Sequence, residues 1–273
     1  MASYCKDWEE IYPMVAQRPQ DFSALPLNSS GIYVMNANSL LDTERVDIFD
    51  GGKVAPQSVD LETLTGNKEV VFALNHMLKT KNASFFPGTL LRDFGGFYLP
   101  VIPVISNGKI ISERVEKPGW IYYDDKIALA ERLLGKDFAE KLGDYRGVDF
   151  EGPMEIFKEK LNEKAMKLFE KGFRASKVQG YSALPVICNE IAIIPDLYEG
   201  NRVNLIAHCC NDLYESEEAR EESYSIFAKR MKDRGLAEKE LYIASSQLGS
   251  RGSEYGNFTG LFMHEKGKLC RLK

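Results

Sequence analysis

Two kinds of hydrophobic pattern alternate along the chain, and together they predict an α/β fold. Short apolar runs that end in polar or turn-forming residues are typical of buried strands. We expect such strands at 31–37, 45–49, 69–75, 99–106, within 183–195, at 202–210 and at 241–247. Longer segments with apolar residues three and four positions apart indicate helices at 124–135, 153–173 and 216–235. The alternation of strands and helices in the second half predicts a sheet with helices on its faces.

The predicted architecture is one α/β domain that spans residues 1–273. We expect a mixed, mainly parallel sheet flanked by helices, with Rossmann-like or macro-domain-like layering. The dipeptide Asn107-Gly108 favours a tight turn between the run 99–106 and the polar strand that follows it. Residues 97–123 are therefore expected to form a small antiparallel hairpin insertion.

Composition narrows the class of protein without fixing its function. The hydrophobic fraction of 44% and the charged fraction of 27% are ordinary for a globular domain. The net charge of −5 argues against a general nucleic-acid binder, because such proteins carry a basic patch. We find no run that resembles a signal peptide or a membrane helix, and the five cysteines are scattered. We therefore expect a cytoplasmic protein without nucleic-acid or membrane partners, and the oligomeric state stays open.

Polar and small residues gather where the predicted strands end. Ligands of open parallel sheets bind beyond the carboxyl ends of the strands, so these residues mark one candidate edge. Four strand ends contribute to it: Asn36 and Asn38; Asn75 and His76; His208, Cys209, Asn211 and Asp212; and Ser245, Ser246, Gln247, Gly249, Ser250, Arg251 and Gly252. If the strands are parallel neighbours, all four groups meet.

Four of these residues have side chains suited to catalysis. His208 and His76 are candidate acid/base groups, and Cys209 is a candidate nucleophile with Asp212 beside it. The alternative interpretation is that the cysteine at the strand end is buried and inert, and that the polar side chains form hydrogen bonds with the backbone of their own loops. The remaining residues are candidate ligand-binding groups.

Arg251 stands in a loop rich in glycine and serine, where backbone N–H groups can approach an anion closely. Its guanidinium could hold a phosphate or carboxylate, whereas the alternative is a solvated surface turn. We expect no metal site, because the chain has three histidines and lacks a metal-binding motif. We expect no cofactor, because nicotinamide and flavin patterns are missing.

The order of strand, Asn-containing loop, helix, strand and Gly-Ser loop at 202–252 resembles that of ADP-ribose-binding macro domains, in particular their microbial glycohydrolase branch. The resemblance covers about a fifth of the chain and implies a nucleotide-like ligand at the strand ends. The glycine triplet and the paired glutamates of that branch have no counterpart here, so its activity is not carried over.

Two hypotheses follow for the function. The first is a protein that binds, and hydrolyses or transfers, a phosphorylated or nucleotide-like small anionic molecule at the carboxyl-terminal edge of the sheet. The second is a non-catalytic interaction or regulatory protein that uses the α/β fold as a scaffold. Fold class does not choose between an enzyme and a scaffold.

Overall fold

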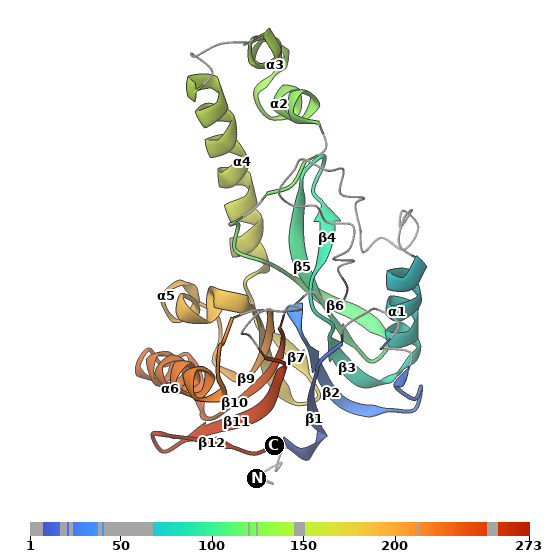
Figure 1. Ribbon diagram of the computed structural model, residues 1–273, viewed down its shortest axis with the longest axis vertical. Helices are drawn as coiled ribbons and strands as arrows, with labels where there is room; N and C mark the ends of the chain where they lie inside the picture. The colour runs from blue at the N-terminus through green and yellow to red at the C-terminus, as the bar shows by residue number, and fades with distance from the viewer. Residues whose placement is uncertain are drawn as a thin grey trace.

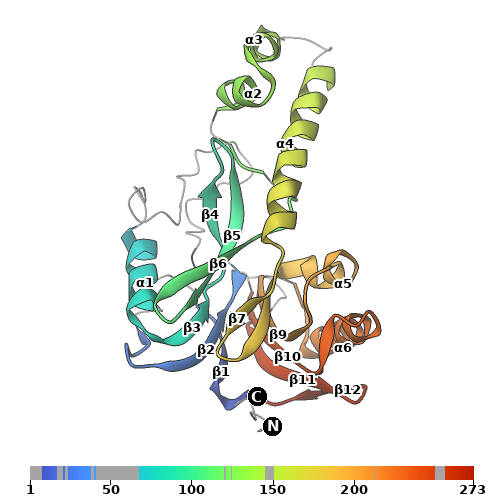
Figure 2. The same cartoon turned by 180° about the vertical axis from the view of Figure 1, so that it is seen from behind.

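The computed structural model describes residues 8–16, 21, 24–37, 40, 68–119, 121–123, 125–144, 151–211, 213–249 and 256–273. In these residues the chain forms two six-stranded sheets that pack face to face, with helices on their outer sides (Figure 1). The view from behind shows the same layers and the long helix α4 extending away from the sheets (Figure 2).

The first sheet has the strand order β1-β2-β3-β5-β4, with β6 paired to β5. Its strands are β1 (Ile11–Met14), β2 (Ser30–Met35), β3 (Asn82–Phe86), β4 (Leu90–Asp93), β5 (Tyr98–Ser106) and β6 (Lys109–Val115). The pairs β1–β2 and β2–β3 are parallel, and the pairs made by β5 are antiparallel. Asn107 and Gly108 both have positive φ, as the predicted tight turn between β5 and β6 requires.

The second sheet has the order β12-β11-β10-β9-β8-β7. Its strands are β7 (Ser176–Val178), β8 (Tyr181–Ile187), β9 (Val203–Asn211), β10 (Ala237–Leu248), β11 (Phe258–Glu265) and β12 (Lys268–Arg271). Strands β8, β9 and β10 run parallel to one another. Helix α6 (Glu217–Asp233) connects β9 to β10, and Ser216 Oγ accepts a hydrogen bond from the backbone N–H of Ala219 at its start. The strands predicted at 202–210 and 241–247 and the helix predicted at 216–235 are therefore confirmed, and the two strands pair in parallel.

The other helical segments lie outside the two sheets or at their ends. They are η1 (Trp8–Glu10), α1 (Lys68–Lys79), α2 (Lys126–Leu134), α3 (Lys136–Asp144), α4 (Glu151–Gly172), η5 (Cys188–Ala192) and α5 (Ile194–Leu197). Helices α2 and α3 pack near the far end of α4, whereas α5 and α6 cover the second sheet (Figures 1 and 2). No helix in the described ranges is both long and apolar enough to span a membrane.

Three clusters of buried apolar side chains hold these layers together. One fills the space between the sheets, where Val34 and Ile102 of the first sheet meet Leu205 and Ala244 of the second. A second cluster joins the first sheet to α1 and to the helices α2–α4. The third packs the second sheet against α5, α6 and the end of α4. The layers therefore follow the order helix, sheet, sheet, helix.

Two parts of the predicted fold need correction. The α/β class and the flanking helices are confirmed, but one mainly parallel sheet of Rossmann-like or macro-domain type is not. Instead there are two mixed sheets, in which antiparallel pairs outnumber parallel ones among the described strands. The strand predicted at 69–75 is wrong, because that segment belongs to helix α1. Val70, Ala73, Leu74 and Met77 have helical spacing and are fully buried, so burial on one helical face outweighs the β-propensity of the valines. The strand predicted at 45–49 lies outside the described residues.

Candidate functional site

The most unusual backbone conformation occurs at Cys188, where β8 ends and η5 begins. Its φ is 43°, in the left-handed region that non-glycine residues rarely adopt. Among the described residues, the other non-glycine positions with positive φ are Asn107, Gln179 and Lys266. Each of those three precedes a glycine in a hairpin turn, where positive φ is expected. Cys188 has no such turn to explain it, and unexplained strain of this kind clusters at functional sites.

Cys188 also differs from the neighbouring residues in its exposure. It is partly exposed, whereas every residue of β8 is buried. Its thiol lies 3.9 Å from the backbone oxygen of Asn211, at the end of the adjacent parallel strand β9. A sharp turn from a strand into a helical segment, with a serine or cysteine side chain at the end of the strand, is the geometry of a nucleophile elbow.

The two sheets meet beside this turn. Asn36 follows β2 of the first sheet, and its Nδ2 lies 3.5 Å from Oδ1 of Asn211 in the second. The Oδ1 of Asn36 accepts a hydrogen bond of 2.8 Å from the backbone N–H of Ala16. Asn36 is fully buried and Asn211 is partly exposed. Two of the predicted strand-end residues are thus brought together next to Cys188, although they come from different sheets.

A buried carboxylate fixes the opposite side of the Cys188 turn. Oε2 of Glu190 lies 3.1 Å from the backbone N of Ile187 and 3.0 Å from Nη2 of Arg114. Oε1 of the same group accepts a 2.6 Å hydrogen bond from the backbone N–H of Lys117. One side chain therefore fastens the segment that follows β6 to the residues on both sides of Cys188.

The segment after β6 carries two further titratable residues, Glu116 and Lys117, both partly exposed. Burial, and to a smaller extent the charge of the nearby Glu190, raise the pKa of Glu116 to about 8, although Arg114 opposes the shift. A carboxyl group with such a pKa holds a proton at neutral pH and can donate it. Lys117 supplies a cation within one residue of it. Through the backbone N–H groups of Ile187 and Lys117, Glu190 therefore holds the segment that carries Glu116 and Lys117 against the Cys188 turn.

His208 is not free to take up or release a proton, because it lies fully buried in β9. Its Nε2 is 2.8 Å from the backbone oxygen of Cys188, and its Nδ1 is 2.8 Å from the hydroxyl of Tyr224. Burial, and to a smaller extent the charge of Arg220, lower the pKa of His208 to about 4, although the hydrogen bond to the backbone oxygen of Cys188 opposes the shift. The ring is neutral at physiological pH, so the geometry does not favour the predicted acid/base role.

The other predicted residues of β9 and β10 are packed in the interior. Cys209, Ser245, Ser246 and Gln247 are all fully buried. Burial raises the pKa of the Cys209 thiol far above its usual value, so it stays protonated and does not favour the predicted role as a nucleophile. The hydroxyl of Ser246 donates to the backbone oxygen of Met14 and so links the two sheets.

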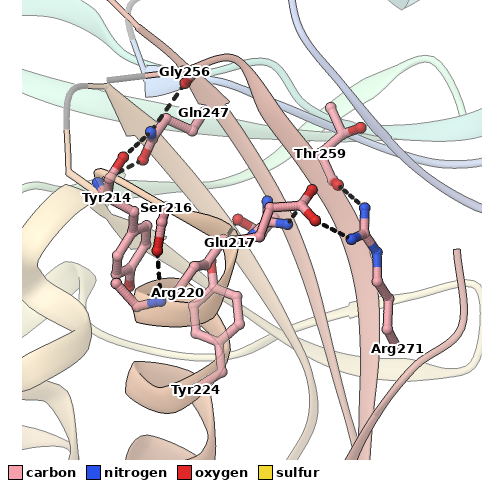
Figure 3. A network of polar contacts seen from close by, with 11 residues as sticks. Tyr214, Ser216, Glu217, Arg220, Tyr224, Gln247, Gly256, Thr259 and Arg271 are labelled. Atoms are coloured by element: carbon pink, nitrogen blue, oxygen red, sulfur yellow. Dashed lines mark hydrogen bonds and ion pairs between the residues drawn. The ribbon is translucent and has the colours of Figure 1, made fainter. Parts of the chain in front are cut away.

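The side-chain amide of Gln247 forms hydrogen bonds with the backbone of two loops, as Figure 3 shows. Its Oε1 accepts from the backbone N–H of Tyr214, and its Nε2 donates to the backbone oxygens of Tyr214 and Gly256. All polar atoms of its amide are used in joining two loops. The side chain therefore has little capacity left for a ligand.

The remaining predicted site residues do not join this group or lie outside the described residues. His76 and Asn75 belong to helix α1 and not to a strand end, and Nε2 of His76 is 2.7 Å from the backbone oxygen of Leu25. The backbone N–H of Gly249 is 3.0 Å from Oδ1 of Asn257. Four predicted residues and the loop arginine lie outside the described residues: Asn38, Asp212, Ser250, Gly252 and Arg251.

The strand-end interpretation missed Cys188, Glu190, Glu116 and Lys117. The signal for the first two is the polar triplet Cys188-Asn189-Glu190, which interrupts the apolar run 183–195. The same rule that selected the ends of β9 and β10 applies to this strand end. No group of three or more His, Cys, Asp or Glu residues that could hold a metal occurs in the part of the chain that the structure describes.

Comparisons with known proteins identify no family for this chain. No protein-family model matches it, and no curated protein matches it. Among solved structures it is similar to the glutamine-dependent NAD+ synthetase from Acinetobacter baumannii in complex with adenosine diphosphate, with 12% sequence identity and a TM-score of 0.46. The match covers 88% of this chain and 36% of the synthetase chain, so this chain spans about a third of that protein's length.

Proposed function

We propose that the protein is a thiol-dependent enzyme that transfers or hydrolyses an acyl group of a small molecule, with Cys188 as the nucleophile. The observation that carries the proposal is the left-handed conformation of Cys188 at the end of β8, outside any hairpin turn. The partial exposure of the thiol supports it, because a nucleophile must reach its substrate.

In the proposed reaction the Cys188 thiolate attacks first, and the ammonium group of Lys117 is assigned the role of stabilising it. Sγ forms a bond to the carbonyl carbon of an amide or ester, and the bond from that carbon to the leaving nitrogen or oxygen breaks. The carboxyl group of Glu116 gives its proton to the leaving group. Water then attacks the thioester, its proton returns to Glu116, and the thiolate is released with a free carboxylic acid.

Asn211 is proposed to orient the substrate, and the fully buried Asn36 is proposed to hold the Asn211 amide in place. Asn211 is partly exposed beside the thiol, and its amide can bind polar groups of a ligand. The ligand class remains the one expected from the sequence, a small anionic molecule of phosphorylated or nucleotide-like character. Arg251 stays a proposed anion-binding residue.

A test of the proposal uses p-nitrophenyl acetate, an activated ester that needs no knowledge of the natural substrate. The protein should release p-nitrophenolate in a burst equal to the enzyme concentration, as an acyl-enzyme intermediate accumulates. Mass spectrometry of the quenched and digested protein should find the acetyl group on Cys188. Cys188→Ser should remove the burst and the modification, and Lys117→Met should slow the burst. Glu116→Gln should slow the steady release that follows the burst, because p-nitrophenolate leaves without a proton whereas attack of water on the thioester needs a base.

The matched control is Cys270→Ser, which removes an exposed thiol on β12 and should leave the burst unchanged. Acetylation spread over surface lysines, with the same burst in Cys188→Ser, would contradict the proposal. That result would favour the second hypothesis, a non-catalytic interaction or regulatory protein. Binding of a partner without acyl transfer would then be the activity to look for.

A further inference from the structure

The backbone oxygen of Cys188 is held by a buried side chain that the proposed chemistry does not use. His208 Nε2 lies 2.8 Å from this oxygen. A carbonyl oxygen can only accept a hydrogen bond, so Nε2 is the donor and Nδ1 is the unprotonated nitrogen of the neutral ring. The imidazole is therefore fixed in one tautomer by the Cys188 turn.

The hydrogen bonds continue beyond the imidazole into α6 and β10. Nδ1 of His208 lies 2.8 Å from the hydroxyl of Tyr224, and this hydroxyl lies 2.5 Å from Oγ of Ser245. His208, Tyr224 and Ser245 are all fully buried. The tyrosine ring also packs edge-on against His208, with ring centroids 5.5 Å apart. The histidine cannot change rotamer without leaving several buried polar atoms unpaired.

We infer that His208 is a positioning residue that holds the Cys188 turn in its left-handed conformation, and so determines where the Cys188 thiol is presented. Strained backbone persists only where surrounding contacts over-determine it. Here two side chains do so from opposite sides: Glu190 binds the N–H of the preceding residue, Ile187, and His208 binds the carbonyl of Cys188. The importance of the thiol position for catalysis rests on the proposed function. The effect of His208 on the backbone conformation of Cys188 does not depend on it.

The chain supplies an internal test for whether a variant stays folded. Cys209 and Cys210 are fully buried on either side of β9, directly after His208. Their thiols should react with iodoacetamide only when the fold opens. Cys270 is exposed and reports the reactivity of an ordinary surface thiol.

The experiment measures the alkylation rate of each cysteine by iodoacetamide between pH 6 and 9, with every site resolved by mass spectrometry. In His208→Leu the Cys188 rate at neutral pH should fall about tenfold or more, because a small displacement of a reacting group has effects of that order. Its pH profile should shift towards that of Cys270. His208→Gln keeps an N–H donor near the position of Nε2 and should retain most of the rate.

A second measurement follows the turn itself. Amide hydrogen exchange in peptides that cover residues 187–190 should accelerate in His208→Leu and not in His208→Gln, while peptides from α4 stay unchanged. If Cys209 and Cys210 become labelled in His208→Leu, the fold has opened, and Tyr224→Phe then replaces it as the variant that weakens the anchor. The inference would be overturned if Cys209 and Cys210 stay unlabelled in the variant, while the alkylation profile of Cys188 and the amide exchange of residues 187–190 are the same as in the wild type.

The two proposals fail in different ways. If wild-type Cys188 has the rate and pH profile of Cys270 but its turn loosens in His208→Leu, the proposed function is wrong and the positioning role stands. If wild-type Cys188 is unusually reactive and stays so in His208→Leu with Cys209 and Cys210 protected, the positioning role is wrong and the nucleophile stands.

Discussion

The ends of β8 and β9 lie side by side in one sheet, but they differ in the burial of their cysteine and histidine side chains. At the end of β9, His208, Cys209 and Cys210 are fully buried, and His208 is held by hydrogen bonds at both ring nitrogens. At the end of β8, Cys188 is partly exposed and its backbone is strained. Both ends carry residue types suited to catalysis. Burial and backbone conformation, rather than residue type, separate the supporting strand from the candidate site.

The largest expected effect is the loss of stability in Glu190→Gln, a substitution that tests whether Glu190 fastens the Cys188 turn. Glu190→Gln leaves Arg114 fully buried beside the rings of Phe169 and Phe173 without its counter-charge. Removing one partner of a buried ion pair costs about 3–5 kcal/mol of unfolding free energy. Urea unfolding followed by circular dichroism measures the change.

Glu163→Gln is the matched control, because Glu163 binds Lys160 and Lys167 on the exposed side of α4. Ion pairs of this exposed kind contribute little to stability, so the control should unfold at the wild-type urea concentration. Equal, small effects of both substitutions would show that Glu190 does not fasten the turn, and would remove the distinction between the two strand ends.

The second effect concerns pH and Glu116. A carboxyl group whose pKa rises from 4.5 to about 8 on folding binds more protons in the folded state within that window. The free energy of unfolding therefore falls as pH rises towards 8, by up to about 1.4 kcal/mol for each pH unit. Glu116→Gln should remove this decline, which thermal melts between pH 6.5 and 8.5 can follow.

The chosen range avoids the opposite contribution of His208. The pKa of His208 is lowered from 6.5 to about 4, so its stabilising contribution is complete above pH 6.5 and is lost as pH falls towards 4. Glu159→Gln, an exposed position on α4, serves as the control and should keep the wild-type decline. A decline that persists unchanged in Glu116→Gln would mean that Glu116 ionises like a surface carboxylate.

The third effect measures the strain at Cys188. Glycine adopts positive φ without the steric cost that other residues meet, so Cys188→Gly should be more stable than Cys188→Ala by about 1 kcal/mol. Asn189 is the control, because it is exposed and does not have positive φ. There the order should reverse, with the glycine variant less stable than the alanine variant. If the alanine variant is the more stable one at both positions, the backbone of Cys188 is not strained.

The sequence predicted the second sheet better than the site. The run from β9 through α6 to β10 carries clear period changes and a serine cap, so its strands and helix are confirmed. In α1, Val70 has strand propensity but lies at helical spacing with Ala73, Leu74 and Met77, and only packing against the first sheet decides between the two patterns. The face-to-face pairing of two sheets depends on contacts between residues such as Asn36 and Asn211, which are 175 positions apart.

The candidate site was harder to predict for a physical reason. Residue type and strand-end position select Cys209 and Cys188 equally, and the sequence does not state which thiol is buried. The left-handed backbone at Cys188 arises from Glu190 and His208 acting together, and it appears only when β6, β8 and β9 are assembled. Asn36 and Asn211 could be selected because both follow apolar strands directly. Their roles as ligand-binding residues stay predictions.

One measurement tests the difference between the two strand ends most directly. The wild-type protein is labelled for a short time with limiting iodoacetamide at a series of pH values, and the modified fraction of Cys188, Cys209, Cys210 and Cys270 is compared within each sample. We predict that Cys188 reacts faster than the more exposed Cys270 at neutral pH, while Cys209 and Cys210 stay unmodified. Slower labelling of Cys188 than of Cys270 across the series, or labelling of Cys209 at a similar rate, would contradict the account.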